Sequence, residues 1–478
     1  MKSEVSFETR LGEFHSLDNR LPSIFIVLTA IAISVLLGLG SAQNLIDWRY
    51  ILYIAIAIVV GVVFLFPRDQ VLRMGFYVWI ASFALGFRTF HVTSELSIYP
   101  CEAIIWILFV ALLARTMMRH ERLRTPPLPF AAWGFLVVAL LSLFVALSNG
   151  RSWALILDTF KPTLALYPII IVTYNLIEDK QTWLVTAVVT LFASAYVVGM
   201  GIAEYTIPGF QYPLGDFVRD SSYVQTTVEG FARATFMFWG SPIAILFPVF
   251  SFPWLLVALT QDRHLIRRIL VTGLIGAFLF GLYISGYRSI WFAFAGMLLV
   301  FAYFGGRKSM VWIVLLCALV LVMLPSGFYD RASNLLNLNF TATGNDANRV
   351  MRMQQAWNLA LANPVIGVGW GGSGWVHNDF LQLAADLGFP GLFLFMLWIG
   401  NVLWRLVSDV SRFQTAWSQL CRIVLLTSLV GVALVMAVDA LLVLPVLIFP
   451  VWLNFALAIK LLEQKGARNE TIGIVANV

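Results

Sequence analysis

Long apolar runs separated by short polar connections dominate the chain between residues 22 and 462. A run of about 20 apolar residues is long enough to cross the hydrocarbon core of a bilayer as a helix. Such runs predict spanning helices at 22–41, 50–66, 71–90, 100–118, 129–147, 158–178, 181–205, 236–259, 265–284, 288–306, 309–325, 389–407, 420–441 and 443–462. We therefore expect an all-α polytopic membrane protein with about 12–14 transmembrane helices.

Composition agrees with this pattern, because the chain is 60% hydrophobic and only 12% charged, whereas soluble domains are about 25% charged. Residues 1–20 are polar, and the first apolar run lacks a small-residue cleavage site, so we expect it to remain as a membrane anchor. The net charge of +6 does not indicate nucleic-acid binding, because the basic residues lie in short loops between apolar runs.

Lysine and arginine in these loops predict the orientation. With the N-terminus in the cytoplasm, cytoplasmic segments hold roughly twice as many of them as the opposite side, as the positive-inside rule requires. We expect a protein of the bacterial inner membrane with both termini in the cytoplasm. Residues 1–478 would form a single integral membrane domain with two long non-cytoplasmic segments, a first periplasmic loop at 206–235 and a large loop at 326–388. Long ordered loops usually carry function.

The large loop, which precedes the last three predicted helices, contains five glycines between residues 367 and 374, followed by His377. Glycine-rich backbone can turn its N–H groups toward an anionic ligand. Residues 378–387 predict a short amphipathic helix, with Gly388 as its C-cap and Pro390 at the start of the next spanning helix. His377 can act as a base near neutral pH, or it is a structural histidine bonded to the loop backbone.

Two arginines lie at the edges of apolar runs on the same predicted side. Arg233 precedes the run that starts at Phe236, and Arg288 lies between two spanning helices with almost no loop between them. An arginine at the edge of the hydrocarbon is usually compensated by a partner or a ligand. Snorkelling to headgroup phosphates explains one such residue. Two of them on one side favour a site for a di-anion such as a pyrophosphate.

Other polar residues on this side are weaker candidates. Arg349 and Arg352 share a helical face, so they either solvate the long loop or line a groove. Lys161 starts a spanning segment, and Tyr287 fits either an interfacial aromatic belt or a platform for a sugar ring. Asp439 is expected to be a near-surface, solvated carboxylate.

Nothing in the sequence indicates a bound metal or an organic cofactor. His377 and Asp379 are a thin set of ligands without a second histidine nearby, and no phosphate-binding or dinucleotide fingerprint is present. The three cysteines, Cys101, Cys317 and Cys421, lie in or beside apolar runs and are expected to be inert thiols.

The loop resembles the signature of the O-antigen ligase and polymerase superfamily. The residues that carry the resemblance are Asn363, Pro364, Gly367, Gly369, His377, Asn378, Leu381, Gly388 and Gly391, together with Arg233 and Arg288, which fall where the family places its two key arginines. The resemblance covers the block 230–391. The family often has glutamate where this chain has Asp386.

This resemblance implies a metal-independent glycosyltransferase that takes a glycan from undecaprenyl pyrophosphate at the periplasmic face. The acceptor would be a hydroxyl of lipid A-core or of a growing polysaccharide. By this analogy Arg233 and Arg288 hold the pyrophosphate, and His377 contacts or deprotonates the acceptor hydroxyl. The residues expected to bind substrate besides these three are Asn378, Arg349, Arg352, Lys161, Tyr287 and Asp386. The expected partners are the lipid-linked donor, the acceptor and membrane lipids, without a cofactor or nucleic acid.

Two other classes of function remain open at this point. A transporter of an anionic solute would use the same arginines during alternating access, and it predicts paired halves with broken helices and charges at mid-membrane depth. A scaffold for envelope assembly predicts that His377 is dispensable. The sequence contains neither repeated halves nor a cluster of charges in mid-membrane positions, which favours the transferase.

Overall fold

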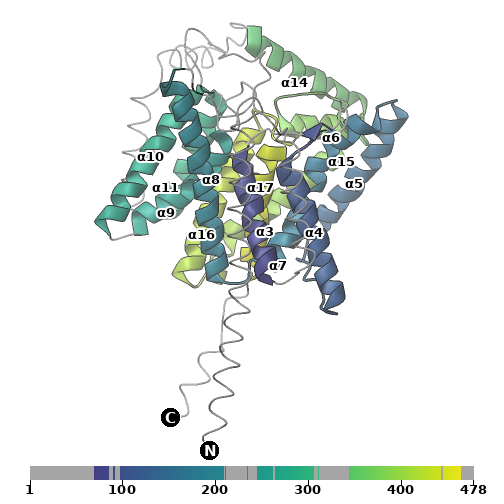
Figure 1. The fold of residues 1–478 in the computed structure, drawn as a ribbon. Coiled ribbons are helices and arrows are strands. Elements are labelled where there is room, and N and C mark those ends of the chain that lie inside the picture. Colours follow the sequence, from purple (N-terminus) through teal and green to yellow (C-terminus); the bar gives the residue numbers. More distant parts are fainter. Residues whose placement is uncertain are drawn as a thin grey trace, which may run out of the picture. The chain divides into compact units, whose positions relative to one another are not determined.

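The computed structural model describes residues 69–85, 90–91, 97–208, 210, 234, 245–261, 264–305, 311, 344–442 and 445–464. These residues are almost entirely helical, which confirms the all-α fold class (Figure 1). Within them, the exception is a short antiparallel pair, β1 (Phe90–His91) and β2 (Ser97–Ile98), in which Phe90 pairs with Ile98.

The helices follow the order of the chain. They are α3 (Asp69–Ala81), η1 (Ser82–Leu85), α4 (Pro100–Met118), α5 (Phe130–Ser148), α6 (Trp153–Leu164), α7 (Leu166–Leu176), α8 (Lys180–Thr206), α9 (Leu246–Gln261), α10 (Leu265–Ser285), α11 (Arg288–Gly305), α14 (Gly344–Ala362), α15 (Asp379–Ser408), η4 (Val410–Arg412), α16 (Ala416–Met436) and α17 (Pro445–Glu463). In the described ranges, 7 stretches are long and apolar enough to span a membrane: Pro100–Met118, Phe130–Ser148, Trp153–Leu176, Lys180–Thr206, Leu265–Ser285, Asp379–Ser408 and Ala416–Met436. The protein is therefore a multi-pass membrane protein.

Most predicted spans within these ranges match helices to within a few residues. The prediction of a single helix at 158–178 is wrong in detail, because α6 and α7 meet at a break at Ala165 and α6 begins earlier, after its N-cap Ser152. Pro162 and Pro168 lie on either side of the break and cannot donate backbone hydrogen bonds. The predicted spans 22–41 and 50–66 and most of 309–325 lie outside the described residues, so the total number of spans stays a prediction.

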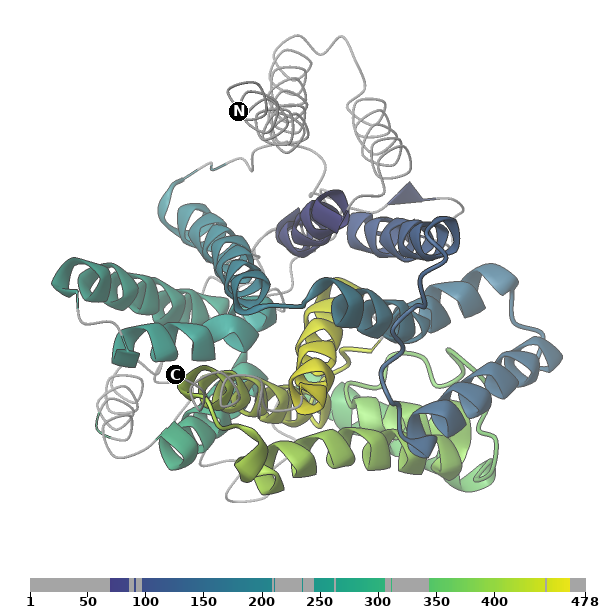
Figure 2. The same cartoon turned by 90° about the horizontal axis from the view of Figure 1, so that it is seen from below.

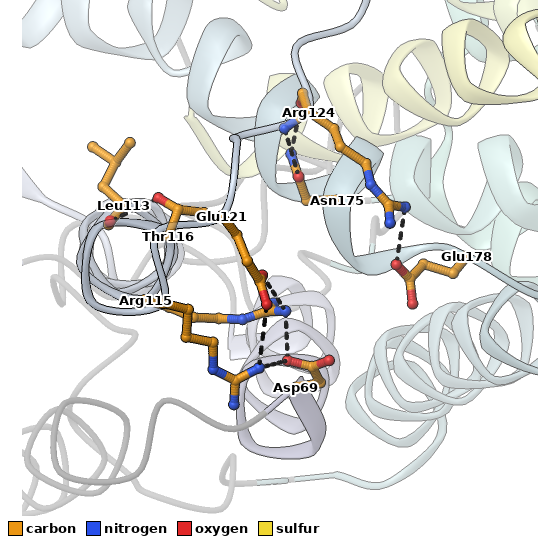
Figure 3. Close-up of polar contacts among 9 residues, drawn as sticks. Asp69, Leu113, Arg115, Thr116, Glu121, Arg124, Asn175 and Glu178 are labelled. Carbon is orange, nitrogen blue, oxygen red and sulfur yellow. Dashed lines mark hydrogen bonds and ion pairs between the residues drawn. The ribbon is translucent and has the colours of Figure 1, made fainter.

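The chain divides into two compact units, one formed by Met1–Gly75 with Val110–Glu121 and the other by Phe76–Phe109 with Arg122–Val478. In the described part of the first unit, Arg115 pairs with Asp69 at 2.7 Å and with Glu121 at 3.3 Å (Figure 3). In the second unit, Arg124 pairs with Glu178 at 3.1 Å and exchanges backbone hydrogen bonds with the amide of Asn175. Exposed pairs of this kind contribute little to stability.

In the second unit, the helix α15 packs against α5, α14, α16 and α17. It lies beside α5 (Figure 2). Its buried Phe395 contacts Phe135 of α5, and its buried Trp398 contacts Phe455 of α17, each with ring centroids 5.3 Å apart. Helix α17 in turn packs against α7. Because aromatic burial of this extent is a large stabilising term, these contacts fix the part of α15 that follows its kink at Gly388.

Candidate functional site

The segment of residues 437–442, between α16 and α17, supports the two residues that precede α15. His377 Nδ1 lies 3.3 Å from Asp439 Oδ1, and the amide of Asn378 donates to the carbonyl of Ala437 at 2.7 Å. The Asn378 side-chain oxygen also accepts the N–H of the third helical residue, as an N-cap does. Both polar ends of the Asn378 side chain thus make a hydrogen bond within the protein, which fixes its position, and the expected contact of Asn378 with substrate stays a prediction.

A second anchor to the same segment comes from Asp379, which is fully buried. Its two carboxylate oxygens accept the N–H groups of Leu441 at 2.8 Å and of Leu442 at 3.1 Å. The helical turns 379–387 are buried apart from the partly exposed Phe380 and Leu381, and the polar Gln382 and Asp386 are among the buried residues, so the predicted amphipathic character is wrong. The sequence pattern was misleading because carboxylates that accept backbone hydrogen bonds can be buried like apolar side chains.

The backbone of His377 adopts a left-handed conformation, with φ of 59°. Residues other than glycine seldom adopt it, and when they do, the surrounding packing has to hold them there. On one side Val376 is fully buried against Ala356 and Ala385, and on the other side Asn378 caps α15. A conformation fixed in this way keeps the imidazole in one place.

The imidazole of His377 is half-buried and has two partners at one nitrogen. The indole N–H of Trp375 donates to Nδ1 at 3.1 Å, and the Asp439 carboxylate faces the same atom. Burial lowers the pKa of His377 to about 4, and the positive charges of Arg349 and Arg352 add to this effect. The ring is therefore uncharged at neutral pH, and Nε2 is the nitrogen left for a ligand.

Asp439 is 1% exposed, so the expectation that it is a solvated surface carboxylate is wrong. Burial raises the pKa of Asp439 to about 7, although the N–H of Ala440 opposes the shift by donating to the carboxylate. The sequence gave no signal for its place beside His377, because the two residues come from segments that only the fold brings together. Buried acids next to a histidine commonly set which ring nitrogen carries the proton.

The glycine-rich loop surrounds a carboxylate of the protein itself. The backbone N–H groups of Gly371 and Ser373 donate to Asp386 at 3.2 Å and 2.8 Å, and Asp386 is 1% exposed. We expected these N–H groups to face an anionic ligand, but the anion they bind is internal. Asp386 therefore shapes the loop, and its expected contact with substrate stays a prediction.

Pro390 explains how the loop attaches to α15. Proline lacks an N–H, so the carbonyl of Asp386, four residues earlier, is free of its helical partner. It accepts instead from the N–H of Gly369 and from the hydroxyl of Ser142, both at 3.0 Å. Gly388 takes φ of 74° at the kink, as the predicted C-cap requires.

The link between α5 and α6 holds the loop from its other side. Arg151 donates to the carbonyls of Gly371 and Gly372 at 2.8 Å and 3.1 Å, and the indole N–H of Trp370 donates to Ala139 of α5 at 2.8 Å. Sequence reasoning missed Arg151. The signal was available, because it is an arginine at the edge of a spanning run on the predicted side of the loop, like Arg288.

Arg349 and Arg352 lie on α14, which packs on α15. Arg352 donates to the carbonyl of Trp375 at 3.1 Å, two residues before His377. Both arginines are close enough to lower the pKa of His377. Of the two alternatives considered from the sequence, this placement favours a positively charged lining beside the imidazole.

The two arginine segments highlighted by the sequence meet at the end of α10. Arg233 lies outside the described residues, but the N–H of Ala234 donates to the carbonyl of Ile284 at 3.1 Å. The chain then turns at Gly286, and α11 begins at Arg288. Tyr287, in this turn, is 7% exposed, and its hydroxyl has no partner among the described residues.

The packing of α11 on α16 relates Arg288 to His377. A Cβ on Gly296 would meet Leu434, and a Cβ on Gly431 would meet Met297, so the helices touch through small residues and run antiparallel. In this register the start of α11 is level with the residues that follow α16, which are those that hold His377. Arg288 thus begins its helix at the same end of the bundle as His377.

Lys161 is placed in a separate cluster. Its ammonium lies 3.1 Å from Glu102 and 3.1 Å from Asp158, and it sits over the ring of Tyr99. These contacts compensate the charge of Lys161 within the protein, and its expected contact with substrate stays a prediction.

Among the described residues, no group of three His, Cys, Asp or Glu side chains is arranged to hold a metal ion. The expected independence from metal stays a prediction.

Part of the chain that contains this site matches a known protein family. Residues 272–396 match the family model described as O-antigen ligase. The matched range includes Arg288, Asp386 and His377 and confirms the resemblance seen in the sequence, whereas Arg233 lies before it. No curated protein matches the chain. The chain is therefore a multi-pass membrane protein that carries an O-antigen ligase domain in residues 272–396.

Proposed function

We propose that the protein transfers a glycan from undecaprenyl pyrophosphate to an acceptor hydroxyl at the periplasmic face of the inner membrane. The acceptor is lipid A-core or the end of a growing polysaccharide. The observation that carries this proposal is the setting of His377: an uncharged imidazole, fixed by Asp439 and flanked by Arg349 and Arg352, inside a segment that matches O-antigen ligase.

The proton of the acceptor hydroxyl goes to Nε2 of His377. For this the reactive tautomer carries its proton on Nδ1 and makes an Nδ1–H hydrogen bond to ionised Asp439, so the Nε2 lone pair is available to accept a proton. As Nε2 gains the proton, the imidazolium that forms is stabilised by the Asp439 carboxylate 3.3 Å away. The hydrogen bond from Trp375 to Nδ1 favours the other tautomer, so it marks a resting arrangement that ionised Asp439 must displace.

The acceptor oxygen then forms a bond to the anomeric carbon, and the bond from that carbon to the pyrophosphate oxygen breaks. The pyrophosphate leaves with the electron pair, and its growing negative charge needs cationic partners. Arg288, at the start of α11, and Arg233, next to Ala234, are the residues we assign to this task. Attack from the face opposite the leaving group inverts the anomeric centre.

Transfer in proteoliposomes with purified lipid-linked donor and acceptor tests the assignment. We expect His377→Gln and Arg288→Ala to lose transfer while they keep the thermal unfolding and elution profile of the parent. Arg267→Ala is the matched control, because Arg267 lies near the opposite end of the hairpin formed by α10 and α11. Full activity of both His377→Gln and Arg288→Ala would refute the proposal.

A deletion strain distinguishes the two acceptors. Loss of long glycan from the cell surface with intact lipid-linked polymer identifies a ligase. Accumulation of single lipid-linked repeat units identifies a polymerase.

A further inference from the structure

Helix α14 has three distinct faces along its length. One face, with Ala356 and Ala360, is buried against α15 and the segment before it. A second face is polar and exposed and contains Gln355 and Asn358. The third face is apolar and exposed.

We call this third face the α14 stripe. It consists of Val350, Trp357 and Leu361, which recur at helical spacing with the exposed Gln354 among them, and it continues into Val365 and Ile366 just after the helix. Their exposed fractions are 45%, 45%, 54%, 66% and 54%, respectively. Scattered exposed apolar residues are ordinary, but apolar residues gathered on one helical face, from Trp357 through Leu361 to Ile366, indicate a surface that something covers.

The α14 stripe is continuous with a surface that already faces lipid. The carbonyl of Pro364 accepts the N–H of Phe389 at 2.8 Å, and the ring of Trp357 lies 6.0 Å from that of Phe389. Beyond Phe389, α15 is a candidate membrane span whose Phe393 is 64% exposed and whose Leu397 is 49% exposed. One apolar surface therefore runs from the lipid-facing side of α15 onto α14. Figure 1 shows α14 next to α15.

We propose that α14 is an interfacial helix whose stripe is immersed in the leaflet of the bilayer that surrounds this end of the bundle. Amphipathic helices that lie in the interface present an apolar face to the acyl chains and a polar face to water, which is the arrangement of Leu361 and Gln355. Trp357 is the residue type enriched at that depth.

This placement has a consequence for the site. Arg352 of α14 donates to the carbonyl of Trp375, and Ala356 packs against Val376, so α14 is attached to the two residues before His377. The bilayer thus sets the height of His377 relative to lipid phosphates. The inference about α14 itself does not depend on the proposed transfer reaction.

The test uses single cysteines at Leu361 and Gln355, in a variant whose three native cysteines are replaced by serine or alanine, labelled with a nitroxide in proteoliposomes. Collision with oxygen, which concentrates in lipid, is compared with collision with a water-soluble nickel chelate. We expect the logarithm of the oxygen-to-nickel ratio to be positive for Leu361→Cys and negative for Gln355→Cys. A negative value at both positions would overturn the proposal, and so would exclusion of both reagents from position 361, since that would indicate a covering protein segment.

A second measurement keeps the native cysteines. A diazirine amino acid at position 361 is expected to form adducts with phospholipid on illumination, and the same group at position 355 is expected to react with water. Adducts with water alone at both positions would contradict an interfacial location of α14.

Discussion

Replacing Asp386 with asparagine tests whether the internal carboxylate holds the glycine-rich loop. Asp386 is 1% exposed, and its two oxygens accept the N–H groups of Gly371 and Ser373. Asparagine keeps one oxygen and turns an NH2 group toward the other N–H. The change removes one hydrogen bond to a charged group, about 1.5–3 kcal/mol, and leaves a buried donor unsatisfied, about 1–3 kcal/mol. Because neighbours relax, we expect local opening of the loop to become easier by about 2–4 kcal/mol.

Hydrogen exchange of the amides, followed by mass spectrometry of the protein in detergent, measures this opening. At about 1.4 kcal/mol per factor of ten, exchange in peptides that cover 367–374 should accelerate by about 30–700-fold. Asp379 provides the matched control, since it is buried on the same helix and its oxygens hold Leu441 and Leu442 instead. Asp379→Asn should accelerate exchange at 437–442 and leave the glycine-rich loop unchanged. Equal effects of both variants on both segments, or no effect of Asp386→Asn, would refute the reasoning.

Two further predictions concern the imidazole and the loop. The transfer rate should increase as the pH rises through about 7, because Asp439, whose buried carboxyl has a pKa of about 7, has to be ionised to accept Nδ1–H. Asp439→Asn should be slow and lack this limb of the pH profile, whereas Trp375→Phe should retain it, and a limb that persists in Asp439→Asn would contradict the role of this acid. Gly369→Ala should destabilise the loop by at least about 2 kcal/mol, because its φ is +85° and a Cβ would lie 2.4 Å from the backbone nitrogen of Ala146. Gly374→Ala, with φ of +68° and open space around its Cβ, should cost only about 1 kcal/mol, and thermal unfolding of both variants in detergent would expose an error if the two costs were equal.

Several parts of the site were readable in the chain. Gly388 and Pro390 predicted the end of a short helix and the start of the next spanning one, and the structure has a kink at Gly388 that separates these two parts of α15. These residues act through their own backbone, since proline lacks an N–H and glycine tolerates positive φ. A property that depends on one residue's own geometry can be predicted without knowing its neighbours.

The hydrogen-bond partners of the buried polar residues could not be predicted from the sequence. Asp386 and Asp379 looked like polar positions on an exposed helical face, yet both are buried and hold backbone segments. Arg151 is adjacent in sequence to none of the residues it holds, and Asp439 lies far from His377 along the chain. Hydrophobic patterning describes whether a side chain prefers lipid or water, and it does not report which backbone N–H group a buried carboxylate will meet.

The sequence by itself determined that this protein crosses the membrane many times, and it predicted that the chemistry belongs to the loop around His377. Apolar run length and glycine and proline positions are enough for that, because the bilayer and the backbone impose the same limits on every chain. Only the tertiary structure decided that the glycine-rich loop surrounds Asp386 and that Asp439 lies beside Nδ1 of His377. Those contacts join α5, α14, α15 and the segment after α16, and they exist only once helices distant in sequence have packed together.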